Sequence, residues 1–448
     1  MTVAAPAPRS IVGSVRRRAE LGLIVLAVVI TGGAYTLASL GHTSSVPTDI
    51  VPFFAFVAGL LLVAHVAVRR LAPNADGLLL PLAALLNGLG YVFIARLDAD
   101  LADNQSTWTA VGIVAFVLTL VVVRRARDLE RYRYTFLLVG ILLLVMPLLP
   151  GIGRSLNGAR IWVAYGPISF QPGEFAKIAF ALFFASYLVE KRELLGMATF
   201  PRFRPVLPDL KHLGPVLFAW GVAILVMTAQ RDLGSSLLFF ALFIVMLWVA
   251  TGRAAYVVAG VGMFGIAAYG AWTQFDHVRS RVTNWTNPWA DPLGGGHQVI
   301  QAWYALAWGG VAGTGLALGR PDRIPVVEND FIFAAIGEEL GLLGATAILV
   351  SYLLIVGCGL RIAIQAEHSF EKLLATGLTT LVGLQSFVII AGVIRVLPLT
   401  GVVLPFVSYG GSALVANYVL LALLLRISHD SATRRTPARP SVAAGARS

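Results

Sequence analysis

The sequence predicts an all-α polytopic membrane protein with about twelve transmembrane helices. Its 448 residues are 57% hydrophobic and only 13% charged, and the mean hydropathy is +0.80. Soluble domains carry about 25% charged residues, so this chain could not cover its surface in water. The apolar residues also form long continuous stretches, which favour helices over the alternating strands of a membrane barrel.

Twelve stretches approach the roughly 20 apolar residues that a helix needs to cross a bilayer. The first follows Arg16–Arg18 and is longer than the core of a signal peptide, about 7–15 residues, so we expect it to be retained. The predicted spans are 20–40, 51–70, 77–95, 107–123, 134–150, 173–189, 213–229, 233–251, 254–274, 331–358, 373–394 and 410–427.

The basic residues predict the orientation of these spans. Most of the 34 Lys and Arg residues fall in one set of alternate loops and in both terminal segments. Because basic residues are retained on the cytoplasmic side, both termini are expected to be cytoplasmic. The net charge of +11 is therefore interpreted as a topology signal, with attraction to anionic lipid second, and no nucleic-acid partner is expected. We expect disordered tails at 1–19 and 429–448 and one large extracytoplasmic loop at 275–330.

Ionisable residues inside a membrane are costly and are candidates for function. Glu174 and Lys177 are three residues apart and would share one helix face after Pro172. They either neutralise each other so that the helix can cross the membrane, or line a charged, water-accessible groove near the outer surface. Between two later spans, Asp232 follows Arg231, and a salt bridge that fixes two helix ends is preferred over a plain polar turn.

One stretch of the large outer loop combines Pro, Gly, Trp and one carboxylate. Asp291 lies in WTNPWADPLGGGHQ, where proline and glycine indicate a specific turn. Asp291 could be a turn residue or a catalytic base, and His297 is interpreted as an interfacial histidine. The stretch 299–308 places Ile300, Trp303 and Ala307 on one side of an interfacial amphipathic helix.

Near the C-terminus, Arg395 begins RVLPLTGVVLPFVSYGGS, a stretch rich in proline, glycine and hydroxyl groups that includes Ser408. It predicts irregular backbone at membrane depth, which is tolerated where it is buried in protein or lines a polar cavity. The single cysteine, Cys358, excludes a disulfide framework, and the scattered histidines support no zinc site.

With these motifs in view, the chain resembles the SEDS family (shape, elongation, division and sporulation). The resemblance covers about 77–428 and uses five motifs in order: NGARIW, QPGEFAK, QRDLG, the WTNPWADPLGGGHQ-to-NDFIFAAIGEELG stretch, and RVLPLTGVVLPFVSYGGS. Family members typically have ten spans, so 20–72 would be two additional N-terminal helices, as in actinobacterial relatives. The modest tails favour an elongation-type over a division-type member. Departures include Gly173, Glu328-Asn329 and His297, and the change at Glu328 leaves any role there open.

The resemblance implies a peptidoglycan glycosyltransferase that polymerises lipid II on the outer face of the bacterial cell membrane, with undecaprenyl diphosphate as the leaving group. It implies that Asp291 is the catalytic base. The other residues that it implies, all in substrate binding, are Arg160, Glu174, Lys177, Asp232, Gln298, Arg395 and Ser408.

The same resemblance implies a divalent cation, Mg²⁺ or Mn²⁺, with ligands left open, and no organic cofactor. It also implies a class B penicillin-binding protein as the transpeptidase partner. A lipid-linked precursor flippase or other transporter, a division-type paralogue of the same activity and a non-enzymatic scaffold remain alternatives. Asp291 distinguishes them, because neither a flippase nor a scaffold has much need of an outer-loop carboxylate.

Overall fold

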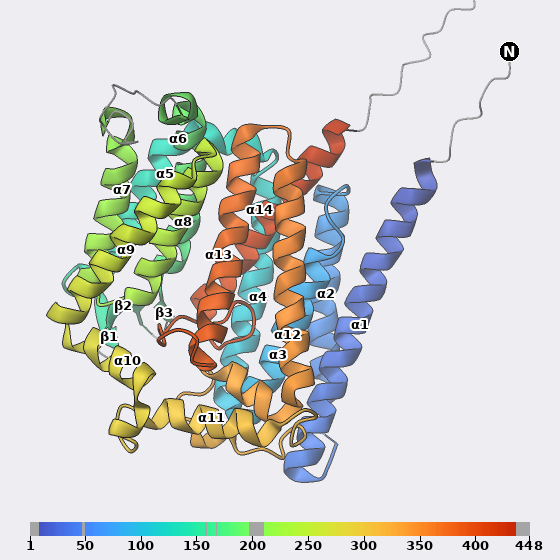
Figure 1. Cartoon of the computed structure of the whole chain (residues 1–448). Helices are drawn as coiled ribbons and strands as arrows, with labels where there is room; N and C mark the ends of the chain where they lie inside the picture. Colours follow the sequence, from blue (N-terminus) through green and yellow to red (C-terminus); the bar gives the residue numbers. More distant parts are fainter. Residues whose placement is uncertain (1–8, 47–49, 157–158, 167, 197–209, 436–448) are drawn as a thin grey trace, which may run out of the picture.

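The computed structural model describes residues 9–46, 50–156, 159–166, 168–196 and 210–435. Long helices lie side by side in a bundle, and two shorter helices, α10 and α11, cross one end of it (Figure 1). The bundle helices are α1 (Arg9–Thr43), α2 (Ile50–Leu71), α3 (Leu79–Leu97), α4 (Ala99–Val122), α5 (Arg133–Val145), α6 (Pro172–Gly196), α7 (Leu210–Ala229), α8 (Leu233–Thr251), α9 (Ala254–Gln274), α12 (Ile332–Gln365), α13 (Ser369–Val393) and α14 (Gly411–Arg435).

Eleven helices in the described ranges are long and apolar enough to cross a membrane, and each corresponds to a predicted span. The predicted span 213–229 corresponds to α7, whose described apolar part, Leu217–Ala229, is shorter. The prediction of a polytopic helical protein is confirmed, whereas the count of twelve spans stays a prediction.

The described ends of the chain, at the start of α1 and the end of α14, lie at the same end of the bundle, opposite α10 and α11 (Figure 1). This arrangement agrees with the predicted orientation, and the cytoplasmic location of the termini stays a prediction.

The disordered tails predicted at 1–19 and 429–448 were too long. The backbone is helical from Arg9 and again to Arg435, so disorder over 9–19 and 429–435 was wrong. The remaining tail residues, 1–8 and 436–448, lie outside the described part.

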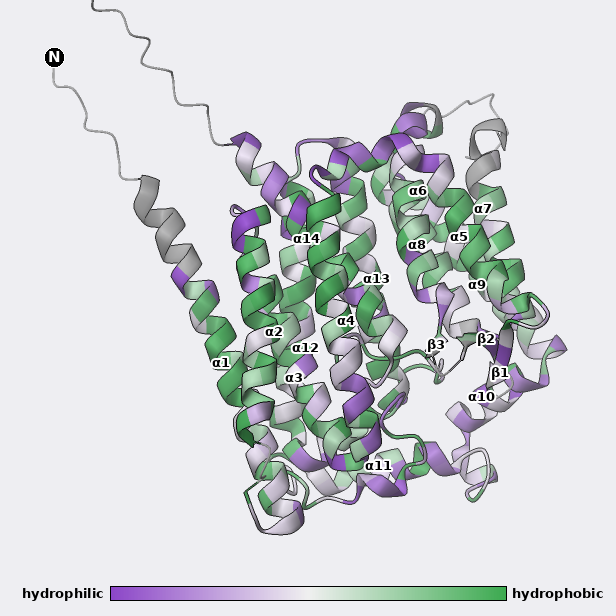
Figure 2. Cartoon of the chain, turned by 180° about the vertical axis from the view of Figure 1, so that it is seen from behind, coloured by the Kyte–Doolittle hydropathy of each residue, from purple (hydrophilic) through white to green (hydrophobic). Residues whose placement is uncertain are grey.

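Burial separates a central set of helices from a peripheral set. In α6, α13 and α14, 78–89% of the most apolar window is buried, against 11% in α9 and 22% in α2. Since lipid tails are themselves apolar, the exposed side chains of the peripheral helices need no protein partner. Figure 2 shows hydrophobic residues along the bundle and hydrophilic ones gathered at its ends and on α10.

A small antiparallel sheet is a correction to the all-α prediction. Strands β1 (Gly153–Leu156), β2 (Ala159–Tyr165) and β3 (Ile168–Phe170) pair in sequence order at the end of the bundle where α10 lies. Isoleucine, tryptophan and valine in β2 favour a pleated backbone. The NGARIW motif thus contributes a strand, with its first two residues, 157 and 158, outside the described part.

The large loop is mostly structured. It contains α10 (Asp276–Thr286), a short 3₁₀ turn (Pro288–Ala290) and α11 (His297–Gly309). The predicted helix at 299–308 is confirmed as α11. Its buried face differs from the predicted one, because Ile300 is buried while Ala307 is exposed; the other buried residues of α11 are Ala302, Ala305 and Gly309.

Two breaks interrupt the helices at this end of the bundle. α12 is kinked at Gly341, whose φ of +66° suits glycine. The predicted irregular backbone near the C-terminus is confirmed as a non-helical connection between α13 and α14, which we call the 394–410 segment. Arg395 and Phe406 in it adopt positive φ values of 65° and 66°. Its first part is exposed, whereas 404–408 are buried.

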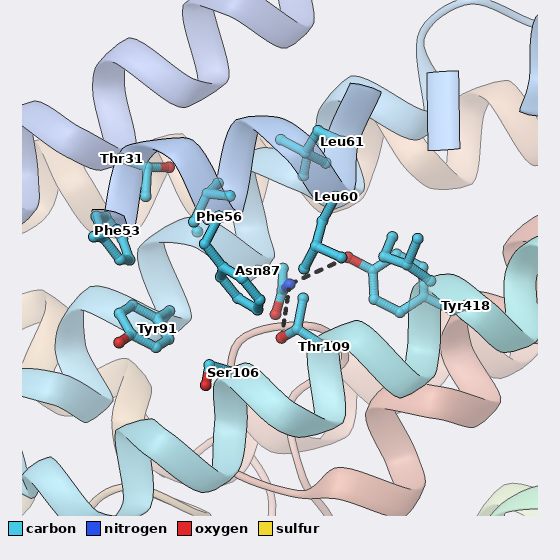
Figure 3. Close-up of a pocket in the computed structure, with 14 residues that line it drawn as sticks. Thr31, Phe53, Phe56, Leu60, Leu61, Asn87, Tyr91, Ser106, Thr109 and Tyr418 are labelled. Atoms are coloured by element: carbon cyan, nitrogen blue, oxygen red, sulfur yellow. Dashed lines mark hydrogen bonds between the residues drawn. The ribbon is translucent and has the colours of Figure 1, made fainter. Parts of the chain in front are cut away.

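The two N-terminal helices pack on the core along a seam between α1 and α2 on one side and α3 and α4 on the other. A small cavity of about 40 Å³ lies in this seam and is lined mainly by apolar side chains such as Phe53, Phe56 and Leu60 (Figure 3). Asn87 points into it and donates from its side-chain nitrogen to Tyr418 (3.1 Å) and Thr109 (3.3 Å).

Candidate functional site

Asp291 is held by the glycine turn that follows it. Its two carboxylate oxygens accept the backbone N–H groups of Gly294 (3.1 Å) and Gly295 (2.8 Å), and its carbonyl accepts that of Gly296 (3.0 Å). A Cβ atom at Gly294 would lie 2.2 Å from Asp291 Oδ2, and one at Gly296 would lie 1.9 Å from the carbonyl of Pro288. The side chain is exposed. The glycines therefore allow a close approach that fixes an accessible carboxylate.

Arg395 connects the 394–410 segment to the loop that carries Asp291. Its Nε donates to the carbonyl of Trp285 (2.8 Å) and its Nη2 to that of Thr286 (2.6 Å), at the C-terminus of α10. The indole N–H of Trp285 donates back to the carbonyl of Arg395 (3.0 Å). The guanidinium also lies 4.5 Å from the ring centre of Trp303 on α11. A cation is favourable at a helix C-terminus and over an aromatic face, so this position is well defined.

Glu174 and Lys177 form a buried ion pair inside the bundle. Their charged atoms are 2.8 Å apart, and each side chain is about 4–5% exposed. Lys177 Nζ also donates to Gln385 Oε1 (3.0 Å), and Gln385 Nε2 donates to the carbonyl of Val403 (2.8 Å). Of the two predicted alternatives, the geometry matches the neutralising ion pair. It does not place these side chains in a water-accessible groove. The pair supports the 394–410 segment from within.

Asp232 caps α8 and does not form the expected salt bridge. Its Oδ1 accepts the backbone N–H of Ser235 (3.0 Å), and in the described part of the chain no ion pair joins it to Arg231. The positive φ of Arg231, 61°, turns the chain sharply before the helix, and the short carboxylate then satisfies a free N–H group. Gly234 approaches the 394–410 segment closely, since a Cβ there would lie 2.6 Å from the carbonyl of Thr400.

Ser408 is built into the backbone of the site. It is 4% exposed, its hydroxyl donates to the carbonyl of Asn329 (2.6 Å), and it accepts the N–H of Leu404 (2.9 Å). The hydroxyl thus ties the 394–410 segment to the residues before α12.

Arg160 and Gln298 each fix a neighbouring loop. The backbone N–H of Arg160, in β2, donates to the carbonyl of Gln230 (3.1 Å), and its Nη2 donates to that of Leu149 (3.3 Å). Gln298 Nε2, on α11, donates to the carbonyl of Pro325 (2.6 Å). Within the described ranges, neither residue forms a hydrogen bond with Asp291 or Arg395.

Arg281 and Asp330 were missed by sequence reasoning. Arg281 Nη1 donates to the carbonyl of Thr400 (2.8 Å), and Gly401, with φ of +72°, lies close to both side chains. Burial raises the pKa of Asp330 from 3.8 to about 6, with Arg281 opposing and Glu328 adding to the rise. One feature of the sequence could have identified Asp330. It is an acidic residue directly before an apolar span, and a carboxylate is costly at a membrane edge.

The site is therefore assembled around the 394–410 segment. It is contacted by α8, α10, α11, α13 and the residues before α12, and α6 supports it indirectly through Gln385 of α13. Of the predicted site residues, Arg395 binds the chain at Thr286, five residues before Asp291, and Ser408 ties the segment to Asn329. Glu174 and Lys177 reach the segment through Gln385, and Asp232 caps α8. The arrangement presents an exposed carboxylate and an oriented guanidinium on connected parts of the chain, which suits a proton acceptor and an anion-binding group.

The comparisons with known proteins agree on one family. Residues 78–433 match the FtsW/RodA/SpoVE family, described as a cell cycle protein. The peptidoglycan glycosyltransferase RodA of Mycobacterium tuberculosis is 44% identical over 445 residues, covering 96% of this chain and 95% of the relative. The stage V sporulation protein E of Bacillus subtilis is 33% identical over 374 residues, covering 80% of this chain and 97% of the relative.

Solved structures extend this similarity to the fold. A chain of a peptidoglycan synthase complex that coordinates polymerisation and crosslinking matches with a TM-score of 0.66 and 27% identity, covering 80% of this chain and 98% of that one. RodA of Thermus thermophilus matches with a TM-score of 0.57 and 26% identity, covering 80% and 97%. The family match begins after α2, at residue 78, whereas the mycobacterial alignment covers 96% of the chain; the two additional N-terminal helices stay a prediction.

Proposed function

The chain belongs to the FtsW/RodA/SpoVE family, and from that premise we propose that it is a peptidoglycan glycosyltransferase. It polymerises lipid II into glycan strands at the outer face of the bacterial cell membrane, with undecaprenyl diphosphate as leaving group, and serves cell elongation. The observation that carries the proposal is the exposed Asp291 carboxylate, fixed by two backbone N–H groups beside the loop that Arg395 clamps.

In this reaction Asp291 takes the proton of the acceptor sugar's 4-hydroxyl group. The oxygen attacks the anomeric carbon of the donor, and the bond to the lipid diphosphate breaks with its electron pair on the diphosphate. General-base assistance of this kind is typically worth about 10²–10⁴ in rate. Inversion at the donor carbon needs one base on the acceptor side, and a diphosphate leaves without a strong acid. One key carboxylate therefore suffices where glycosidases use two.

Arg395 is the cation best placed to receive the diphosphate charge. Two of its guanidinium nitrogens bind backbone carbonyls, the residue is exposed, and the guanidinium lies 4.5 Å from the ring centre of Trp303. Lys177 is committed to Glu174 and Gln385 inside the bundle, so we assign it a positioning role for the 394–410 segment. Charge stabilisation by an oriented donor requires no rearrangement during the reaction.

The metal-ligating side chains available in the described part of the chain favour a divalent cation that would arrive bound to the substrate. Among the described residues, no group of three or more His, Cys, Asp or Glu side chains could hold a metal ion. Mg²⁺ is commonly bound through one or two carboxylates plus substrate phosphates, and Asp291 could provide one. Such an ion would neutralise charge on the leaving diphosphate.

A class B penicillin-binding protein is the proposed partner, because a polymerised strand must be crosslinked by a transpeptidase. The structural relative that coordinates polymerisation with crosslinking supports this pairing.

Polymerisation by Asp291→Ala tests the proposed function. The purified variant, reconstituted with lipid II and a divalent cation, is expected to make no detectable glycan strands, while its melting temperature matches that of the wild type because the side chain is exposed. The matched control is Asp276→Ala, which removes another exposed outer carboxylate and should polymerise normally. Full polymerisation by Asp291→Ala would refute the catalytic assignment, and lipid II transport without polymerisation by the wild type would favour a flippase.

A further inference from the structure

The helix α10 lies outside the core and leads directly to the turn that carries Asp291. Each of its residues is at least partly exposed, so burial alone does not hold the helix in place. Backbone hydrogen bonds continue from the helix into the turn. The N–H of Asn287 donates to the carbonyl of Thr283 (2.7 Å), and that of Ala290 donates to the carbonyl of Asn287 (3.2 Å). The position and direction of α10 therefore set where the Asp291 carboxylate lies.

Two arginines join α10 to the 394–410 segment, in opposite directions. Arg395 of the segment donates to the carbonyls of Trp285 and Thr286 at the C-terminus of α10. Arg281 of α10 donates to the segment, from Nη1 to the carbonyls of Thr400 (2.8 Å) and Leu399 (3.4 Å). The two attachment points on α10 are thus about 6–8 Å apart along the helix. A helix held at one point can pivot, whereas two points also fix its direction.

The point to which Arg281 binds is itself supported by the core. A Cβ atom at Gly234, in the first turn of α8, would lie 2.6 Å from the carbonyl of Thr400, so this carbonyl rests against a bundle helix. A Cβ atom at Gly401 would lie 3.4 Å from Arg281 Nη2 and 3.6 Å from Asp330 Oδ2, and the charges of these two side chains attract each other.

The stretch around Arg395 is different, because residues 394–396 are exposed. Arg395 therefore joins α10 to an exposed part of the segment, and Arg281 joins it to a part that packs on α8.

We propose that Arg281 is a positioning residue for the catalytic carboxylate: its bond to the Thr400 carbonyl fixes the direction of α10 and so the place of Asp291. The proposal rests on the glycosyltransferase function and gives Arg281 a role separate from substrate binding. Proton transfer requires the acceptor hydroxyl within about 2.6–3.2 Å of the base. Loss of Arg281 therefore slows the chemical step and leaves the binding of lipid II unchanged.

Arg281→Ala in the full-length protein tests this role by separating kcat from KM. The kcat for lipid II polymerisation is expected to be about tenfold to a hundredfold lower, because a displacement of about 1 Å at a reacting group can lower the rate about 100-fold. The KM for lipid II and the melting temperature should stay near their wild-type values. Arg281→Lys keeps an N–H donor on a long side chain and should recover part of the lost kcat.

The matched control is Arg279→Ala on the same helix. Its side chain is exposed and pairs with Asp276, so its removal should change neither kcat nor KM.

A distance between two spin labels measures the position of the turn without turnover. One label is placed at Leu293→Cys, whose side chain is 90% exposed beside Asp291, and the other at Asn104→Cys, exposed on α4 of the bundle. The native cysteine, Cys358, is buried and so protected from labelling. The otherwise wild-type protein should give one narrow distribution of distances. Arg281→Ala should broaden or shift this distribution, and Arg279→Ala should not.

An unchanged kcat or an unchanged distance distribution in Arg281→Ala would overturn the positioning role. A higher KM with an unchanged kcat would overturn it in favour of direct contact between Arg281 and the substrate. A lowered melting temperature in Arg281→Ala, with no recovery of kcat in Arg281→Lys, would overturn it in favour of a general role in folding. Absence of polymerisation by the wild type would instead refute the proposed function, and a broadened distance distribution would still support the attachment of α10 by Arg281.

Discussion

The seam between α1–α2 and the core and the outer region around α11 each contain a cavity with a buried polar side chain in its wall, yet they differ in kind. At the seam, Asn87 lines about 40 Å³ of mainly apolar space. In the outer region, Glu338 lines a cavity of about 280 Å³ together with arginines and aromatic rings. The first cavity is small and apolar, whereas the second is larger and has charged side chains in its wall.

This difference predicts where substitutions should affect stability and where they should affect activity. At the seam, the buried Asn87 side chain joins α3 to α4 and α14 beneath the two N-terminal helices. In the outer region, polar groups of the chain hold exposed side chains such as Asp291 in position. Substitutions at the seam are therefore expected to lower stability with little loss of specific activity, and those that displace Asp291 to lower activity with little loss of stability.

The largest effect is expected at the turn after Asp291. In Gly296→Ala a Cβ would lie 1.9 Å from the carbonyl of Pro288, so the turn must rearrange and the carboxylate must move. A displacement of about 1 Å at a reacting group can lower the rate about 100-fold. The measurement is the initial rate of lipid II polymerisation beside the melting temperature, which should stay near that of the wild type. Gly270→Ala, at an open position on α9, is the control, and equal rates in the two variants would contradict this account.

An intermediate effect is expected at Asp330 and should depend on pH. The carboxyl ionises near pH 3.8 when unfolded and near pH 6 when folded, so the folded protein binds more protons between these values. Stability from this group is therefore full at low pH, falls as the pH rises through this window, and stays lowered above it. Asp330→Asn should remove that fall, a difference of about 3 kcal/mol at most.

Melting curves of wild type and Asp330→Asn between pH 4 and pH 8 measure this, because other titrations cancel in the difference. Exposed Asp322 supplies the control variant, Asp322→Asn. Parallel curves for wild type and Asp330→Asn would show that the burial of this carboxyl has no energetic consequence.

The smallest effect is expected at the seam. Tyr418→Phe removes the hydroxyl that accepts the Asn87 side-chain N–H, and it leaves the ring contacts with Phe116 and Phe406 intact. The loss of one such hydrogen bond typically costs about 1 kcal/mol. Melting temperature should fall slightly while the polymerisation rate per folded molecule is retained. A large loss of activity without a change in melting temperature would erase the distinction between the two regions.

Much of the fold was predictable because apolar length is a local property. Eleven of the predicted spans, the α11 helix and the broken backbone after α13 all follow from short windows of sequence. The sheet was missed because β1 and β3 have three or four residues each, and pairing along β2 stabilises them. The predicted disordered tails were too long, because the polar ends of α1 and α14 are still helical.

The candidate site was predictable as a set of residues and only partly as an arrangement. Asp291, Arg395 and the Glu174–Lys177 pair were identified because ionisable groups are rare in such a chain. The hydrogen-bond partner of Asp232 was not predicted. A carboxylate that follows an arginine in sequence is equally able to cap the next helix. The importance of Arg281 and Asp330 depends on the fold of the 394–410 segment between them.

By itself the sequence determined that most of the chain lies in helices suited to a bilayer, and which charged residues are exceptions to that rule. The tertiary structure alone decided that Glu174 and Lys177 are buried while Asp291 is exposed, and that a cavity opens beside α11 with Glu338 in its wall. The physical reason is that hydropathy and helix length are set by neighbouring residues. Burial and close glycine contacts are set by segments that meet only when the whole chain has packed.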